Sequence, residues 1–149
     1  MPTLLVVHHT PSPALHTLLE AVLDGAARVE GVEVRVRPAL TAAALDVLEC
    51  DGYVLGTPAN LGMVSGALKH FFDVVYYPCL GATAGRPYGL YVHGNDDVQG
   101  AVRDVERIVT GLRWRQVHDH VRVLGPPAPD AVEACWDLGA TVAVRLAEP

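Results

Sequence analysis

The stretch from Asp51 to Asp73 constrains the fold more than any other part of this chain. It begins with Tyr53-Val54-Leu55, a short apolar run that predicts a buried strand. Residues 56–62 then combine glycine, proline and asparagine, and they predict a loop in which regular structure stops. A strand and a tight loop followed by a helix form half of a βαβ unit, whose ligands collect at such loops. The helix is indicated by apolar residues at helical spacing, namely Val64, Ala67, Leu68, Phe71, Phe72 and Val75.

The rest of the chain alternates between strand and helix patterns. Residues 3–8 are nearly all apolar, as expected for a strand covered on both faces, whereas 32–37 alternate strictly, as expected for an edge strand. Further strands are predicted at 88–93 and at about 115–124. Four further helices are predicted: the first covers about 15–26 and ends by Gly31, and the second covers 42–48 with Thr41 as its cap. The third runs from a cap at Asn95 or Asp96 through Leu112, and the fourth covers 130–146. Right-handed crossovers then make a parallel sheet in an α/β sandwich, although periodicity leaves the strand order open.

Composition narrows the class of protein. The 149 residues form one predicted domain, and a hydrophobic content of 50% with 19% charged residues indicates a globular chain. The net charge of −6 argues against nucleic-acid binding, and no segment is long and apolar enough to span a membrane. Three widely separated cysteines and the lack of a signal peptide favour a cytoplasmic location. We expect no metal site, because the seven histidines show no ligand spacing. The absence of G-x-S-x-G argues against a hydrolase, and the absence of G-x-G-x-x-G argues against a classical dinucleotide-binding fold.

The central stretch resembles the flavin-contacting segment of the flavodoxin-like superfamily. The likeness is greatest to its NAD(P)H-dependent FMN reductase and quinone reductase branch, and it covers roughly residues 3 to 125. It implies an α/β/α sandwich with a five-stranded parallel sheet in the order 2-1-3-4-5, and FMN between the first and third strands. The Gly85-Arg86-Pro87 lead-in to the fourth strand also fits. The matching residues of the central stretch are Gly56, Thr57, Pro58, Asn60, Gly62, Ser65, Lys69, Phe71 or Phe72, and Asp73.

The resemblance places the FMN phosphate on the first loop, residues 8–15. Thr10 and Ser12 would supply hydroxyls, while Ala14 and Leu15 would supply N–H groups at a helix start that favours an anion. The loop departs from the family pattern, because Pro11 and Pro13 each remove a donor and the usual glycine is missing. A plain helix-capping turn is the alternative reading of this loop.

The same resemblance places the flavin ring against two further loops. The second loop would run along the ring edge, with side-chain bonds from Thr57 and Asn60 and apolar contact from Leu61 and Met63. The third loop would close the other side, where Gly94 permits close backbone approach. The expected contacts are Thr57, Pro58, Ala59, Asn60, Leu61, Gly62 and Met63 from the second loop, and His93, Gly94, Asn95 and Asp96 from the third. An ordinary strand–loop–helix corner is the alternative for the second loop.

The resemblance implies an FMN-binding flavoprotein that passes a hydride or electrons from NAD(P)H to a quinone or similar acceptor. Because FMN carries the chemistry, no catalytic side chain is named. Two alternatives stay open: a flavodoxin-type electron carrier, and a scaffold that has lost FMN. The expected partners are a quinone-like small molecule or a redox protein, with a homodimer or homotetramer as the assembly. Tyr76 and Tyr77 would cover a subunit interface, the open flavin face or the core.

Overall fold

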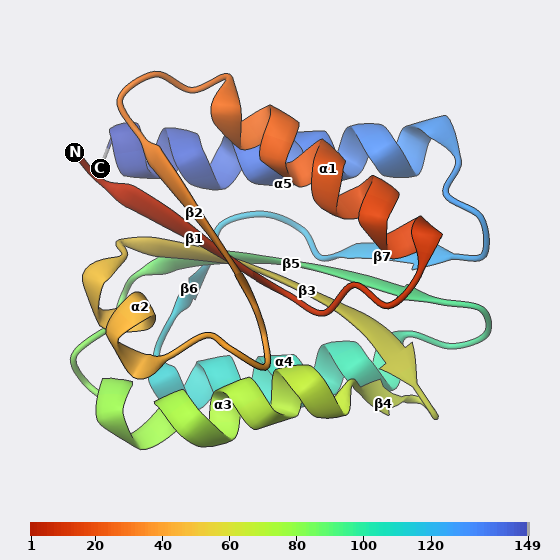
Figure 1. Cartoon of the computed structure of the whole chain (residues 1–149), viewed down its shortest axis with the longest axis horizontal. Helices are drawn as coiled ribbons and strands as arrows, with labels where there is room; N and C mark the ends of the chain where they lie inside the picture. The colour runs from red at the N-terminus through yellow and green to blue at the C-terminus, as the bar shows by residue number, and fades with distance from the viewer. Residues whose placement is uncertain (149) are drawn as a thin grey trace.

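A computed structural model describes residues 1–148, which form one sheet between two helical layers. Figure 1 shows α1 and α5 on one face of the sheet and α2, α3 and α4 on the other. The helices are α1 (Pro13–Ala27), α2 (Ala44–Glu49), α3 (Gly66–Cys79), α4 (Gln99–Leu112) and α5 (Pro129–Ala147). The strands are β1 (Thr3–His8), β2 (Glu33–Pro38), β3 (Gly52–Asn60), β4 (Met63–Val64), β5 (Pro87–Gly94), β6 (Arg115–Gln116) and β7 (Val121–Leu124).

The strand order confirms the predicted sandwich. Strands pair in parallel in the order β2-β1-β3-β5, and both β6 and β7 pair with the far edge of β5. The predicted fifth strand is therefore two short strands, because residues 117–120 leave the ladder between them. Counted as one strand, β6 and β7 complete the order 2-1-3-4-5.

The first strand shows why the sheet needs apolar residues on both faces. Leu4 and Val6 pack into the core under α1 and α5, and Leu5 and Val7 pack into the core under α2, α3 and α4. All four side chains are fully buried. The uninterrupted apolar run predicted from sequence is thus the signature of a strand covered by helices on both sides.

The second loop is the largest correction to the predicted fold. Regular structure does not stop at Gly56, since β3 continues to Asn60 and still pairs with β5 at Thr57 and Pro58. The chain then reverses over Leu61 and Gly62, which have φ angles of 53° and 76°, and β4 pairs antiparallel with β3. Two successive positive φ angles are the mark of the two-residue turn that suits hairpin twist. Val64, predicted on the helix, therefore lies on β4.

The predicted helix boundaries also need correction. Thr41 does not cap α2; its hydroxyl lies 3.3 Å from the Pro38 carbonyl, and the Asp46 carboxylate instead accepts the Ala43 N–H at 3.0 Å. Neither Asn95 nor Asp96 caps α4, which begins at Gln99 with the Gln99 N–H donating to Asp97. Helix α1 ends at Ala27, before Gly31. Asp and Asn can both cap a helix, so the spacing of the apolar residues does not show which of several neighbouring Asp and Asn residues is the cap.

Candidate functional site

The three loops proposed from sequence lie at the carboxyl ends of neighbouring parallel strands, on the right of Figure 1. The first loop is tied to β3 by the His9 N–H, which donates to the Gly56 carbonyl at 3.0 Å. The third loop is tied to the end of β7, because the Gly125 N–H donates to the Gly94 carbonyl at 2.9 Å. In addition, His93 Nε2 lies 2.8 Å from the Gly125 carbonyl oxygen. The sheet therefore fixes where each of these loops begins.

The β3–β4 hairpin, residues 59–64, is attached to α4. The Asp104 carboxylate accepts the Val64 N–H at 2.9 Å. A Cβ at Gly100 would overlap the Gly62 carbonyl, so the first turn of α4 packs directly against the hairpin turn. The hairpin holds Leu61 at its tip, where that side chain is 94% exposed.

Thr57 holds the base of the hairpin from inside. Its hydroxyl lies 2.8 Å from the Pro58 carbonyl and 3.0 Å from Ser65 Oγ, and it accepts the Ser65 N–H at 3.2 Å. Ser65 in turn caps α3 by accepting the Leu68 N–H at 3.2 Å. Thr57 and Ser65 are both fully buried. The expected ligand bond from the Thr57 side chain is therefore corrected, since only its main chain remains for such a contact.

A pocket of about 330 Å³ lies between the second and third loops. Its walls contain five of the residues expected to contact the flavin ring, and Asp97 besides. Those five are Ala59, Leu61, Gly62, Asn95 and Asp96. Gly94 lies at the junction of the two loops, where a Cβ would come within 3.1 Å of Val98 and 3.4 Å of Ala59. The structure thus brings these two loops together around a common space.

Asn60 and Met63 face the other side of the hairpin. They border a second pocket of about 520 Å³ between the hairpin, α3 and α4, and Leu61 borders both pockets. Pro58 pairs with His93 in the sheet, and the His93 side chain is 8% exposed. Six of the expected ring contacts do not line the pocket between the second and third loops, namely Thr57, Pro58, Asn60, Met63, His93 and Gly94.

The first loop forms a capped helix start. Ser12 Oγ accepts the Leu15 N–H at 3.2 Å, and the Ser12 carbonyl accepts the His16 N–H at 3.0 Å. The N–H of Ala14 lies in the first turn and has no carbonyl one turn earlier in the helix to receive it. No acidic residue occupies this turn, so the positive end of the helix dipole is not neutralised there.

Thr10 is held by a histidine at the end of β1. His8 Nδ1 lies 2.7 Å from Thr10 Oγ1. Burial lowers the pKa of His8 from its usual 6.5, and the neighbouring His9 lowers it further. Both effects favour the neutral form of His8. Of the groups expected to hold the phosphate, the Leu15 N–H already donates to Ser12 Oγ and Thr10 Oγ1 contacts His8, whereas the Ala14 N–H has no helix carbonyl to receive it.

Sequence reasoning missed the residues that hold the loops in place. Asp104 and Gly100 anchor the hairpin from α4, and Gly125 clasps the third loop. Tyr91 lies across Gly56, because a Cβ on that glycine would overlap the Tyr91 ring. The one sequence signal of this contact was Gly56 within an apolar strand, with the aromatic Tyr91 in a later strand, because a glycine in a strand often marks a close approach by another residue.

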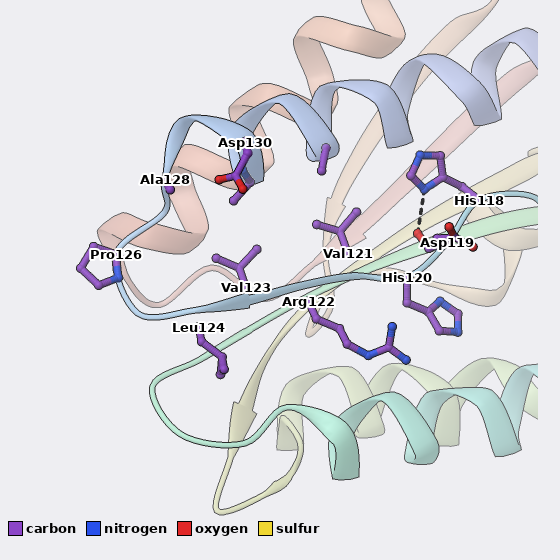
Figure 2. Close-up of a pocket in the computed structure, with 12 residues that line it drawn as sticks. His118, Asp119, His120, Val121, Arg122, Val123, Leu124, Pro126, Ala128 and Asp130 are labelled. Carbon is purple, nitrogen blue, oxygen red and sulfur yellow. Dashed lines mark hydrogen bonds between the residues drawn. The ribbon is translucent and has the colours of Figure 1, made fainter.

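A separate hollow of about 500 Å³ lies along β7 and the start of α5. Figure 2 shows Val121 and Val123 pointing toward α5, and Arg122 pointing away from it. Two of its polar groups are engaged within the protein: Arg122 Nε donates to Gln99 at 2.8 Å, and His118 Nδ1 lies 2.7 Å from the Asp119 carbonyl. His120 Nδ1 is buried there without a hydrogen-bond partner among the described residues. None of the expected site residues lines this hollow, and we do not assign the cofactor to it.

Residues 1–148 contain neither a metal-binding cluster nor a membrane-spanning helix. Within that range, no group of three or more histidine, cysteine, aspartate or glutamate side chains is placed to hold a metal ion. In the same range, none of the helices has the length and apolar character needed to cross a membrane. The cysteines Cys50, Cys79 and Cys135 are all buried and free.

The fold and the three loops define a flavodoxin-like α/β protein with its candidate site at the carboxyl edge of the sheet. The chain matches the NADPH-dependent FMN reductase family over residues 16–125, and it belongs to that family. The match begins just beyond the first loop, whose two prolines depart from the family pattern.

Two curated relatives show what the chain resembles in sequence. It is 37% identical to a flavodoxin of Aquifex aeolicus, over 58% of this chain and 46% of that protein. It is 30% identical to an NAD(P)H dehydrogenase (quinone) of Acidithiobacillus ferrooxidans, over 49% of this chain and 46% of that protein. The chain thus spans less than half the length of these relatives.

Solved structures share the fold at lower identity. A flavodoxin, WrbA-like protein from Agrobacterium tumefaciens superposes with a TM-score of 0.81 at 16% identity, covering 99% of both chains. An oxidoreductase from Corynebacterium diphtheriae gives a TM-score of 0.76 at 19% identity, covering 100% of this chain and 98% of that one. These likenesses show a common flavodoxin-like architecture.

Proposed function

We propose that this chain binds FMN at the three loops and passes a hydride from NAD(P)H to a quinone-like acceptor. The observation that carries the proposal is the pocket between the second and third loops, which is lined by Ala59, Leu61 and Gly62 on one side and by Asn95, Asp96 and Asp97 on the other. Neither 57–64 nor 93–98 contains phenylalanine, tyrosine or tryptophan. A ring lying there would keep one face free for a nicotinamide.

The residues present fit FMN in shape and charge. The absence of a side chain at Gly94 brings the two ring-side loops together, and Ala59 and Leu61 offer apolar contact. A phosphate would meet the Thr10 and Ser12 hydroxyls and the Ala14 N–H at the N-terminus of α1. The first loop contains no carboxylate to repel it.

When bound, the flavin supplies the redox chemistry: two electrons and a proton leave NAD(P)H as a hydride, and a quinone takes up two electrons with two protons. The chain's own residues would position the flavin ring and shield part of it. Backbone groups of the hairpin would meet the polar rim of the ring, and Leu61 at its tip would border the ring without covering it. No side chain needs to act as an acid or base, because water can supply the second proton.

A flavodoxin-type electron carrier is the second candidate, favoured by the sequence identity to the Aquifex aeolicus flavodoxin. The two candidates differ in whether NAD(P)H itself reduces the bound flavin. A redox protein would be the partner in the carrier case, and a small quinone-like acceptor in the enzyme case.

Titration followed by stopped-flow reduction tests the proposal. We expect micromolar or tighter FMN binding, about −8 kcal/mol or better, with FAD bound more weakly. Leu61→Trp should preserve FMN binding, or tighten it by about 0.5–1.5 kcal/mol through ring contact, while slowing reduction by NAD(P)H. Leu45→Trp, on the exposed surface of α2, is the matched control and should alter neither.

Two results would overturn the proposal in different ways. Absence of FMN binding at tens of micromolar (roughly −6 kcal/mol) would support a scaffold that has lost its cofactor. Tight FMN binding with no reduction by NADH or NADPH, but ready reduction by dithionite or a small iron–sulfur protein, would support the carrier.

A further inference from the structure

A hollow of about 570 Å³ lies at the end of the sheet opposite the three loops. It is bordered by the lead-in to β5, the start of β6 and the last turn of α5. In Figure 1 this is the left-hand end of the molecule, where β1 begins and α5 ends. Three of its wall residues are arginines, namely Arg86, Arg115 and Arg145. The chain as a whole has a net charge of −6, so this gathering of cations is a local feature.

Arg86 is held in place along one edge of its guanidinium group. Its Nη1 atom donates to the carbonyl oxygen of Cys50 at 2.7 Å and to that of Val47 at 3.0 Å, at the end of α2. Within residues 1–148 the other two guanidinium nitrogens have no hydrogen-bond partner, and neither of them is buried. A planar group fixed on one edge can bind a ligand with its other edge at little cost in side-chain entropy.

Arg115 and Arg145 are the exposed cations of the hollow. The main chain of Arg115 is fixed by its N–H, which donates to the Arg86 carbonyl at 2.8 Å, and Arg145 lies in the last turn of α5. Neither side chain forms an ion pair with a carboxylate of residues 1–148. Asp51 is the one carboxylate among the residues that border the hollow, and it accepts the Thr3 N–H at 2.8 Å. The hollow therefore holds cations whose charge is not neutralised by close partners.

The balance of charge favours a ligand with two negative charges. Three guanidinium groups and one carboxylate leave the walls with an excess of two positive charges, from which the carbonyl end of α5 subtracts about half a charge. A phosphate monoester carries about −1.5 to −2 at pH 7, and guanidinium groups bind its oxygens in pairs. The arginines come from three separate segments, which suits a tetrahedral group better than a planar carboxylate.

The floor of the hollow is closed and apolar. Leu146 and Pro87 meet over Gly52, where a Cβ would lie 3.0 Å from Leu146 and 3.2 Å from Pro87. Pro2 and Ala84 add further apolar wall. Pockets of this size in proteins enclose whole organic ligands, so a phosphate group alone would leave most of the space unfilled. Arginine side chains also stack on flat rings.

We propose that this hollow binds a nucleoside monophosphate, with Arg86, Arg115 and Arg145 around the phosphate and the apolar floor under the nucleoside. The site is separate from the three loops, because β5, which runs from one end of the sheet to the other, spans about 23 Å. The proposal stands apart from the proposed function, since it requires neither FMN nor NAD(P)H.

Calorimetric titration of the ligand-free protein in a buffer without phosphate tests the ligand class. Adenosine monophosphate should bind with a dissociation constant below about 1 mM, and adenosine at least about tenfold more weakly. Inorganic phosphate should bind more tightly than succinate, a dianion of planar carboxylates. Equal binding of adenosine and adenosine monophosphate would refute a phosphate site, and succinate binding as tightly as phosphate would refute the choice of phosphate over carboxylate.

Arginine substitutions test the walls. Arg115→Gln and Arg145→Gln should each weaken binding of adenosine monophosphate at least about fivefold, because each removes one charge-assisted contact. Both side chains are exposed and unpaired, so the variants should melt at the wild-type temperature, whereas Arg86 is left unchanged because it holds the end of α2. Arg107→Gln removes the same charge from α4 and is the matched control, with an expected effect of no more than about twofold. Equal weakening by all three substitutions would show a general attraction of anions and overturn the site.

Amide chemical shifts locate the bound nucleotide. Adenosine monophosphate should move the N–H signals of Gly85, Arg115 and Leu146, which border the hollow. The signals of Leu15 and His16, at the first loop, should stay in place at ligand concentrations that saturate the hollow. Shifts confined to the first loop would mean that the nucleotide phosphate binds at the start of α1, and the proposed site would then be wrong.

Discussion

Replacing Thr57 by valine tests whether this residue serves the hairpin or a ligand. Valine keeps the shape of threonine but removes the hydroxyl, and this leaves the Ser65 N–H buried without an acceptor. The Pro58 carbonyl and the Ser65 hydroxyl lose their contact with Thr57 Oγ1 as well. A buried unsatisfied group costs about 1–3 kcal/mol and each net hydrogen bond about 1 kcal/mol. We therefore expect Thr57→Val to destabilise the ligand-free protein by about 2–3 kcal/mol.

Thermal and urea unfolding of the ligand-free protein provide the assay. For a chain of this length, about 2–3 kcal/mol lowers Tm by roughly 4–12 °C. Thr17→Val is the matched control, because the Thr17 hydroxyl bonds the Pro13 carbonyl at an exposed position; its effect should stay within about 0.5 kcal/mol. If Thr57→Val leaves Tm unchanged but weakens FMN binding, the hydroxyl serves the ligand and does not stabilise the base of the hairpin.

Two further substitutions test the first loop. Thr10→Ala should weaken binding of FMN by about 1.5–3 kcal/mol and riboflavin far less, since riboflavin lacks the phosphate; equal weakening in calorimetric titrations would place the phosphate elsewhere. His8 has a folded-state pKa below its unfolded value of 6.5, so the unfolded chain binds the extra proton and the free energy of unfolding should fall as pH drops below about 6.5. His8→Asn should flatten this slope in urea titrations between about pH 5 and pH 7.5, and an unchanged slope would show that other groups cause it.

The sequence predicted a structural element correctly where one physical requirement, such as burial, determined which residues it contains. The apolar run of β1 reflects burial on both faces, and the alternating sequence of β2 fits its place at the edge of the sheet, where its four central residues are half-buried. Strand order came from the family resemblance, because periodicity describes one strand at a time and carries no information about its neighbours.

The hairpin escaped prediction for a physical reason. Its turn places a leucine at φ 53°, whereas the usual signal for such a turn is asparagine or glycine at that position. The compensation comes from elsewhere in the chain: Asp104 and Gly100, forty and thirty-eight residues beyond Val64 and Gly62, fix the returning strand. Contacts of that separation leave no local pattern. The same holds for Thr57, whose internal partner Ser65 lies eight residues away across a reversal that was not foreseen.

Leu61 stands between the two pockets and belongs to the walls of both. A molecule that settles on one side of this leucine therefore alters the surface offered on the other. Thermodynamic linkage makes such an influence reciprocal: if a molecule in one pocket strengthens binding in the other by some factor, the second molecule strengthens binding of the first by the same factor. A substitution at this one side chain therefore changes the walls of both pockets at once.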